Sequence, residues 1–223
     1  MLPKIKSPRS LSEQAYLVIK DAILKNQIKP KDVLQEETLA ASLGISRTPL
    51  SAALKKLEFE KLVYMNSSKQ AVVAEVREED MAKIFELRFG IEPLLIKLAC
   101  RRITPEGFSL LEDNLRSTEQ ALQQGELIEV LSCEMEFDKI LADISGNEYI
   151  ADSIDMIATH LQRYFVLSTV NLESTPKALA EHREMLDALK AGDCAKAEKL
   201  CREHLHRVAE RLNLPIPADI IQI

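Results

Sequence analysis

Four polar side chains interrupt apolar helical stripes in the C-terminal part of this 223-residue chain. Glu134 and Asp138 are four residues apart and so face the same side of a helix, while His182 and His204 lie on the stripes of two further helices. A buried carboxylate or imidazole is costly unless it is paired or binds a metal. Two carboxylates and two imidazoles suit Zn²⁺, Ni²⁺, Mn²⁺ or Fe²⁺ without choosing among them. The pattern therefore predicts one divalent metal site shared by three helices.

The alternative is a metal-free site in which the carboxylates pair directly with protonated imidazoles. Arg88 falls at the polar edge of its helix, and a guanidinium beside a metal would hold a small carboxylate ligand with two hydrogen bonds. Arg88 could equally form a salt bridge to Glu92 at i+4, which would contribute little to stability. His160 flanks its apolar stripe, and it either lines the same pocket or is a structural histidine.

A second group of residues, near the N-terminus, could bind nucleic acid. Gly44 ends one short predicted helix, and Ser46 precedes the next, whose first turn holds Pro49. In a helix-turn-helix, the second helix places its N-terminal residues in the major groove of DNA. The free N–H groups at that end suit a phosphate, and Arg47 could reach a base or a phosphate. The predicted DNA-contacting residues are Ser46, Arg47, Thr48, Ser51, Lys55 and Lys69.

The charge distribution favours this interpretation, although the whole chain carries a net charge of −6. Residues 1–76 contain 12 Lys and Arg against 8 Asp and Glu, a net charge of +4, whereas the remaining residues carry −10. A basic N-terminal third on an acidic body is typical of a module that binds a polyanion.

Two further features bear on where the protein works. No run approaches the roughly 18 apolar residues of a membrane span, so we expect a soluble, cytoplasmic protein. The four cysteines are scattered without a CxxC pair, and we expect them to be reduced thiols in the core.

The elements that must position these residues are mostly helices. Aromatic residues make up only 4% of the chain and there are 6 glycines, which argues against an all-β sandwich or barrel. Residues 11–76 predict three helices followed by a hairpin formed by 62–64 and 71–76. From residue 78 onward, apolar spacing predicts a bundle of about six helices with short connections. We therefore predict a mainly α protein, with a winged helix-turn-helix domain at 1–76 and an all-helical domain at 77–223.

These residues and elements resemble a known family. The segment Leu39–Leu54, and most specifically Ser46–Leu54, resembles the DNA-binding domain of GntR-type bacterial transcription regulators. The helical part resembles the ligand-binding domain of the FadR subgroup in its FCD variant. That likeness rests on Glu86-Leu87-Arg88, Glu92-Pro93, Phe137 with Ser145-Gly146-Asn147, Glu181-His182-Arg183, Ala191-Gly192-Asp193 and Glu203-His204-Leu205.

The resemblance implies a transcription regulator, and we expect a repressor. It also implies that the protein binds double-stranded operator DNA as a homodimer and responds to a small carboxylate effector. In the family, an arginine matching Arg88 lies near the effector pocket. Many FCD domains bind a divalent metal through an Asp, a His four residues later and two more His. By position, Glu134 replaces the Asp, Asp138 replaces the first His, and His182 and His204 match the others. The extra carboxylate makes the site more negative and favours Mn²⁺ or Mg²⁺ over Zn²⁺ or Ni²⁺.

The chain departs from the family pattern in its DNA-binding domain. Ser51 and Ala52 replace the usual Arg-Glu pair, Gln70 replaces the usual glycine of the wing, and Glu37 stands where some members have a basic residue. A lost arginine contact to a base costs about 1–3 kcal/mol, so the operator should differ from the common type or binding should be weaker. Two rival functions stay open: a winged domain that binds protein instead of DNA, and a metal-dependent enzyme that uses one of the carboxylates as its base.

Overall fold

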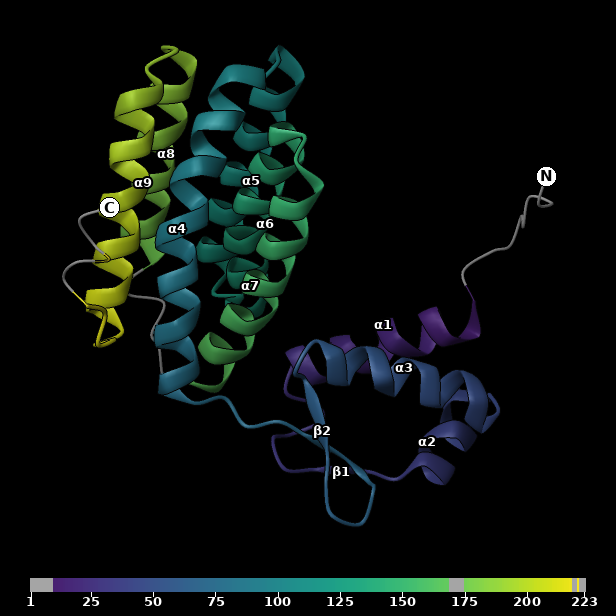
Figure 1. Cartoon of the computed structure of the whole chain (residues 1–223). Coiled ribbons are helices and arrows are strands. Elements are labelled where there is room, and N and C mark those ends of the chain that lie inside the picture. The colour runs from purple at the N-terminus through teal and green to yellow at the C-terminus, as the bar shows by residue number, and fades with distance from the viewer. Residues whose placement is uncertain (1–9, 169–174, 218–219, 221–223) are drawn as a thin grey trace. The chain divides into compact units, whose positions relative to one another are not determined.

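The computed structural model describes residues 10–168, 175–217 and 220, which divide into two compact units between Val76 and Arg77. Figure 1 shows the elements of each unit. The predicted fold class, mainly α with a winged helix-turn-helix before an all-helical part, is confirmed. None of the helices in the described part of the chain combines the length and the apolar character that a membrane span requires.

In its described residues, 10–76, the N-terminal unit contains three helices and a three-stranded sheet. Its elements are α1 (Leu11–Leu24), β1 (Val33–Leu34), α2 (Glu36–Leu43), α3 (Arg47–Phe59), β2 (Val63–Met65) and β3 (Ala71–Val73). The helices and the β2–β3 hairpin are those that the sequence predicts. Strand β1 was not predicted, because two residues have no periodicity of their own. It forms by antiparallel pairing with β3, which lies between β1 and β2.

The turn between α2 and α3 depends on Gly44. This residue has a φ of 65°, a left-handed conformation that glycine adopts without a side-chain clash. The following N–H, of Ile45, then donates to the carbonyl of Ala40 and closes the end of α2. Ser46 occupies the N-cap position of α3, but its side chain accepts no capping hydrogen bond from α3. The start of α3 is therefore set by the turn.

One apolar core holds the N-terminal unit together. Helices and strands both contribute to it: Ile19 of α1, Leu50 and Leu57 of α3, and Val73 of β3 are each at most 1% exposed. A fully buried side chain of this size contributes about 1.5–3 kcal/mol, so the core outweighs any one surface contact. The polar residues of α3 are thereby left on its outer side.

The C-terminal unit is entirely helical in its described residues. Its helices are α4 (Glu78–Arg102), α5 (Pro105–Gln124), α6 (Leu127–Ser145), α7 (Glu148–Leu167), α8 (Thr175–Lys190) and α9 (Cys194–Arg211). Helix α4 packs against α6, α7 and α9, and α8 packs against α5 and α9 (Figure 1). The predicted bundle of about six helices is confirmed.

The cysteines correct the expectation that all four are reduced thiols. Cys100 of α4 and Cys194 of α9 form a disulfide, with their Cα atoms 5.7 Å apart, a separation usual for this bond. Cys133 and Cys201 are free and buried. The disulfide joins residues 94 positions apart, because the bundle packs α4 against α9. No local spacing in the sequence reveals that proximity.

Candidate functional site

The outer side of α3 carries most of the residues predicted to contact DNA. Ser46, Arg47 and Thr48 are exposed at the N-terminal end of the helix. Because residues four apart share a helical face, Arg47, Ser51 and Lys55 form one row along α3. In that row Arg47 and Lys55 are exposed and Ser51 is half-buried. The helix therefore presents cations at both ends of a row of polar side chains.

The turn between β2 and β3 carries the last predicted DNA contact, Lys69. The Asn66 Oδ1 closes this turn by accepting from the N–H groups of Ser68 and Gln70, at 3.0 and 2.9 Å. Lys69 is exposed and has a φ of 57°, in the left-handed region. The left-handed residue of the wing is thus a lysine, next to the glutamine that stands where the family usually has glycine.

Two cations on α3 differ in what they contact. The Arg47 Nη2 forms an ion pair with the Glu37 Oε1 on α2, and both side chains are mostly exposed. Lys56 instead lies over the Tyr16 ring, with its Nζ 3.7 Å from the ring centroid, and pairs with Glu13 at 3.2 Å. Lys56 is therefore held against α1, whereas Arg47 stays on the outer side of the helix-turn-helix.

In the helical unit, the predicted metal ligands lie on the packed faces of three helices. Glu134 and Asp138 are on α6, His182 is on α8 and His204 is on α9. Both histidines are buried, with ring centroids 4.8 Å apart. His182 also stacks on the Phe137 ring at 4.3 Å between centroids. We call these four predicted ligands, together with Arg88, Glu92 and Glu181, the buried polar cluster.

Arg88 lies in the core and not at the polar edge of its helix, which corrects the prediction. It is 3% exposed, and its Nε donates to the Glu92 Oε1 at 2.5 Å. Its Nη2 lies 3.3 Å from the Glu92 Oε2 and 3.8 Å from the Asp138 Oδ2. Burial by itself lowers the pKa of Arg88, but the Glu92 carboxylate outweighs it and raises that pKa. The guanidinium thus stays charged inside the bundle.

Glu181 belongs to the cluster although the sequence predicted no role for it in the site. Its Oε2 lies 2.6 Å from the His204 Nδ1, and its carboxylate also meets Arg207 at 3.2 Å and Arg211 at 3.3 Å. Burial favours a higher pKa for Glu181, but the His204 hydrogen bond and the arginines outweigh it and lower the pKa to about 2. The only signal in the sequence was its place beside His182 in Glu181-His182-Arg183.

The two histidines are neutral in this environment. Burial lowers the pKa of His182 well below its ordinary value, and it also lowers the pKa of His204. A neutral His204 that faces the Glu181 carboxylate donates its Nδ1–H, which leaves its Nε2 as an acceptor or ligand. A carboxylate on the second ring nitrogen is the usual way in which proteins orient a metal-binding histidine.

The carboxyl groups of α6 are the least satisfied part of the cluster. Burial raises the pKa of Glu134 to about 7, and burial together with the Glu92 charge raises that of Asp138 to about 8. The Glu134 Oε1 is buried and has no hydrogen-bond partner among the described residues. Such an atom suits a bound cation or a proton.

The cluster as it stands is not a complete metal centre. No three His, Cys, Asp or Glu side chains within 10–168, 175–217 and 220 converge so as to hold a metal ion. The donor types still fit a divalent cation, since Glu134 has an unpartnered oxygen and His204 is oriented by Glu181. His160, the other predicted effector residue, is half-buried on α7, and its role stays a prediction.

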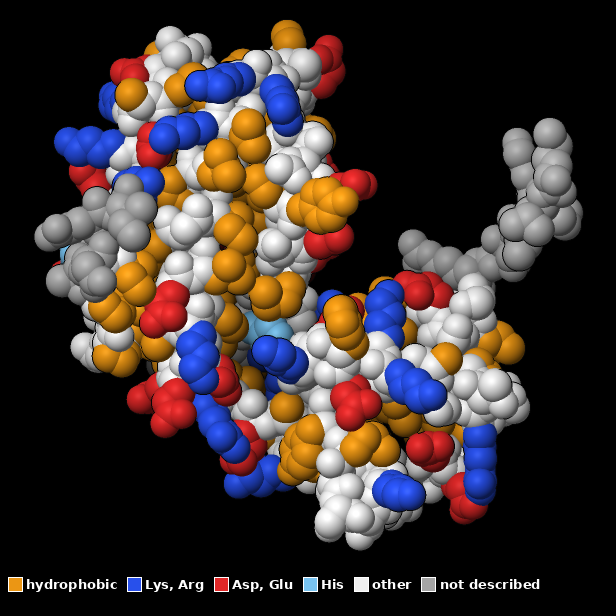
Figure 2. Space-filling view, in the orientation of Figure 1, with side chains coloured by type: hydrophobic (Ala, Val, Ile, Leu, Met, Phe, Trp, Pro, Cys, Tyr) orange, Lys and Arg blue, Asp and Glu red, His pale blue; other side chains and the backbone are white. Residues whose placement is uncertain are grey.

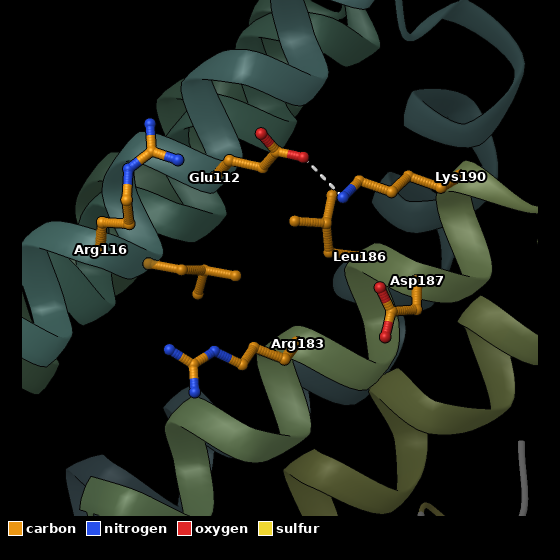
Figure 3. A pocket seen from close by; sticks show the side chains of 7 residues that line it. Glu112, Arg116, Arg183, Leu186, Asp187 and Lys190 are labelled. Atoms are coloured by element: carbon orange, nitrogen blue, oxygen red, sulfur yellow. Dashed lines mark ion pairs between the residues drawn. The ribbon is translucent and has the colours of Figure 1, made fainter.

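A groove of about 250 Å³ opens between α5 and α8, apart from the residues predicted to bind the effector. Figure 3 shows charged side chains from both helices facing each other across it. Its three cations each contact a carboxylate: Lys190 meets Glu112 at 2.6 Å, Arg183 meets Glu119 at 2.7 Å, and Arg116 meets Asp113. Because these charged side chains are already paired, they are not available to bind an ionic ligand.

Comparison with known proteins extends over both units. Residues 11–73 match the model for bacterial regulatory proteins of the gntR family, and residues 83–207 match the FCD domain. The HTH-type transcriptional regulator YdhC of Bacillus subtilis is 24% identical over 210 residues, 94% of each chain. The HTH-type transcriptional repressor RspR of Escherichia coli is 21% identical over 207 residues, 93% of this chain and 91% of the relative. The solved structure of E. coli McbR has a TM-score of 0.80 at 21% identity, and covers 92% of this chain and 99% of its own.

Proposed function

The chain belongs to the GntR family of bacterial regulatory proteins and carries an FCD domain, and from this premise we propose that it is an effector-controlled repressor of the FadR subgroup. Family membership makes it a transcription regulator and not an enzyme. The relative RspR is a repressor, which supports the proposal that this protein represses transcription. The observation that carries the DNA-binding part is the polar row on α3, in which Arg47 and Lys55 are exposed at the ends and Ser51 is half-buried between them. We place the protein in the cytoplasm, where its operator is.

The proposed partner is double-stranded operator DNA, contacted by the start of α3 and by Lys69 of the wing. A mobility-shift titration of the full chain against the DNA upstream of its own gene, with random duplex as control, tests this. We expect tighter binding to the upstream DNA; equal affinity for both would overturn the proposal. The variant Ser51→Arg distinguishes DNA binding from the rival function, in which the winged unit binds only protein. It should raise DNA affinity if α3 docks on DNA, and it should change nothing if the winged unit binds only protein.

We also propose a homodimer, because two winged units can then contact two operator half-sites. The helical unit exposes large apolar side chains, including Leu94 at 49%, Leu110 at 55% and Tyr149 at 77%. Figure 2 shows hydrophobic side chains between the charged ones on the visible face of this unit. Exposed apolar surface is a common feature of association sites. Analytical ultracentrifugation should give twice the chain mass, and a monomer at all concentrations would contradict the proposal.

The proposed effector is a small carboxylate that binds at the buried polar cluster near Arg88, with His160 as a second contact. Glu92 engages two of the five N–H donors of the Arg88 guanidinium, so donors are left for a ligand. An effector changes DNA affinity only if it binds two arrangements of the protein unequally. A thermal-shift screen of small mono- and dicarboxylates should find a stabilising acid whose effect is lost in Arg88→Met.

FCD domains are often associated with metals, and we propose that Glu134, Asp138, His182 and His204 hold a divalent cation here. The unpartnered Glu134 oxygen and the oriented His204 ring support this. When bound, the cation would supply a Lewis acid that anchors the effector carboxylate. Metal analysis, and thermal shifts with Mn²⁺, Zn²⁺, Ni²⁺ or Fe²⁺, test the assignment. The assignment would be contradicted if no cation changes the melting temperature and if Glu134→Gln holds as much metal as the wild type.

A further inference from the structure

The acidic side chain of Glu37 lies within the surface that is proposed to contact DNA. It forms an ion pair with Arg47, the first residue of α3. Lys55 and Lys69, the other cations proposed to contact DNA, have no ion pair within the described residues. The Glu37 and Arg47 side chains are 78% and 65% exposed, and a pair so exposed contributes little to folding. We therefore look for an effect of this ion pair on DNA binding and not on folding.

The chemistry of the pair favours one kind of DNA contact over another. A guanidinium has five N–H donors, and the contact with Glu37 engages Nη2 of Arg47. Two donors suffice for the O6 and N7 acceptors of a guanine in the major groove. A phosphate has no such selectivity, and its negative charge is repelled by a carboxylate on the same guanidinium.

We propose that Glu37 is a specificity-determining residue that holds the Arg47 guanidinium for a guanine and disfavours binding to the phosphate backbone alone. The proposal rests on the proposed DNA-binding function. Non-specific affinity comes almost entirely from phosphates, so a carboxylate at this place lowers it more than it lowers binding to a site with the matching guanine. Glu37 stands where some family members have a basic residue. It would thus lower the overall affinity for DNA and raise the selectivity for the matching sequence.

The test compares two variants that remove the same charge from the same helix. Glu37→Gln removes the carboxylate that contacts Arg47. Glu36→Gln removes the neighbouring carboxylate of α2, which has no ion pair within the described residues. The probes are a duplex selected from a randomised library by the wild-type full chain and a scrambled duplex of the same composition. Affinities are measured at several salt concentrations, and circular dichroism checks that both variants are folded.

We expect Glu37→Gln to bind the scrambled duplex more tightly and to reduce the ratio of selected to scrambled affinity by about tenfold, the size of one base contact. Its salt dependence on scrambled DNA should steepen, since a repulsive charge is gone. Glu36→Gln should leave the ratio unchanged. An unchanged ratio in Glu37→Gln, or equal changes in both variants, would overturn the proposal alone. If the wild-type chain enriches no sequence, the proposed function fails, and the role of Glu37 fails with it.

Discussion

Arg47 and Arg88 each pair with a glutamate, but in opposite surroundings. In the N-terminal unit the side chains of Arg47 and Glu37 are 65% and 78% exposed, whereas in the helical unit those of Arg88 and Glu92 are 4% and 3% exposed. The exposed pair contributes little to folding, because water solvates both charges, so Arg47 can contact DNA without a cost to the fold. A buried pair cannot, because separation leaves a charge in a medium of low polarity.

The same contrast extends to the cores of the two units. The core of the N-terminal unit is made of hydrophobic residues packed between helices and sheet. The core of the helical unit also contains charged and ionisable groups, among them Glu181, His182 and His204. The first unit therefore keeps its proposed function on a surface that folding does not need. In the second unit, the proposed effector site and the fold depend on the same side chains.

The largest expected change in stability follows the loss of the buried Arg88–Glu92 pair. Arg88→Met removes the guanidinium and leaves Glu92 buried without its cation, so the free energy of unfolding of the helical unit should fall by about 3–5 kcal/mol. Urea denaturation of the full chain, followed by circular dichroism, measures this. Arg116→Met is the matched control, because the Arg116 side chain is 65% exposed and pairs on the surface. Equal losses in the two variants would erase the contrast between exposed and buried pairs.

Loss of the disulfide should have the next largest effect, and it should weaken only the helical unit. Replacing Cys100 and Cys194 together by serine opens a link across 94 residues, and the free energy of unfolding should fall by about 2–4 kcal/mol. A reductant should lower the melting temperature of the wild type and leave the double variant unchanged. A wild-type protein that does not respond to the reductant would show that the link contributes nothing to stability.

The pH dependence should come next in size. Glu134 and Asp138 have raised pKa values of about 7 and 8, so between pH 6.5 and 8.5 the folded state still holds protons that the unfolded state has lost. Stability therefore falls as pH rises through this window, by at most about 1.4 kcal/mol per pH unit for each group. The histidines act in the opposite sense but below pH 6.5, because their pKa values are lowered.

Urea denaturation in the presence of EDTA across this pH range measures the effect. The double variant Glu134→Gln, Asp138→Asn should show a flatter profile, because its amides carry no titratable proton. A wild-type stability that rises from pH 6.5 to 8.5 would contradict the assignment of raised pKa values to these carboxyl groups. A divalent cation that removes the pH dependence would support the proposed metal site.

The smallest expected effect on stability is in the exposed pair. Arg47→Ala should change the free energy of unfolding by no more than about 0.5 kcal/mol, as is usual at a surface. The same change should weaken binding to the selected duplex by about 1–3 kcal/mol. Denaturation and a mobility shift on the same preparation separate the two quantities. A large loss of stability would mean that Arg47 belongs to the fold and not only to the DNA-binding surface.

Local patterns predicted the helices well, because apolar spacing and turn residues act over a few positions. The break at Gly44 and the polar row on α3 follow from such patterns. Strand β1 did not, since two residues become a strand only when β3 pairs with them. The buried position of Arg88 was also missed, because Glu92 satisfies its charge within the core.

Local sequence patterns are thus enough to define the helices and the outer side of α3. They do not define which distant residues come into contact. The Cys100–Cys194 disulfide and the Glu181–His204 hydrogen bond join residues 94 and 23 positions apart. Periodicity describes which face of a helix is buried, but the neighbour that this face meets depends on how whole helices pack. The chemistry of the buried polar cluster depends on those neighbours, because in a core of low polarity each partner decides whether a group carries a charge.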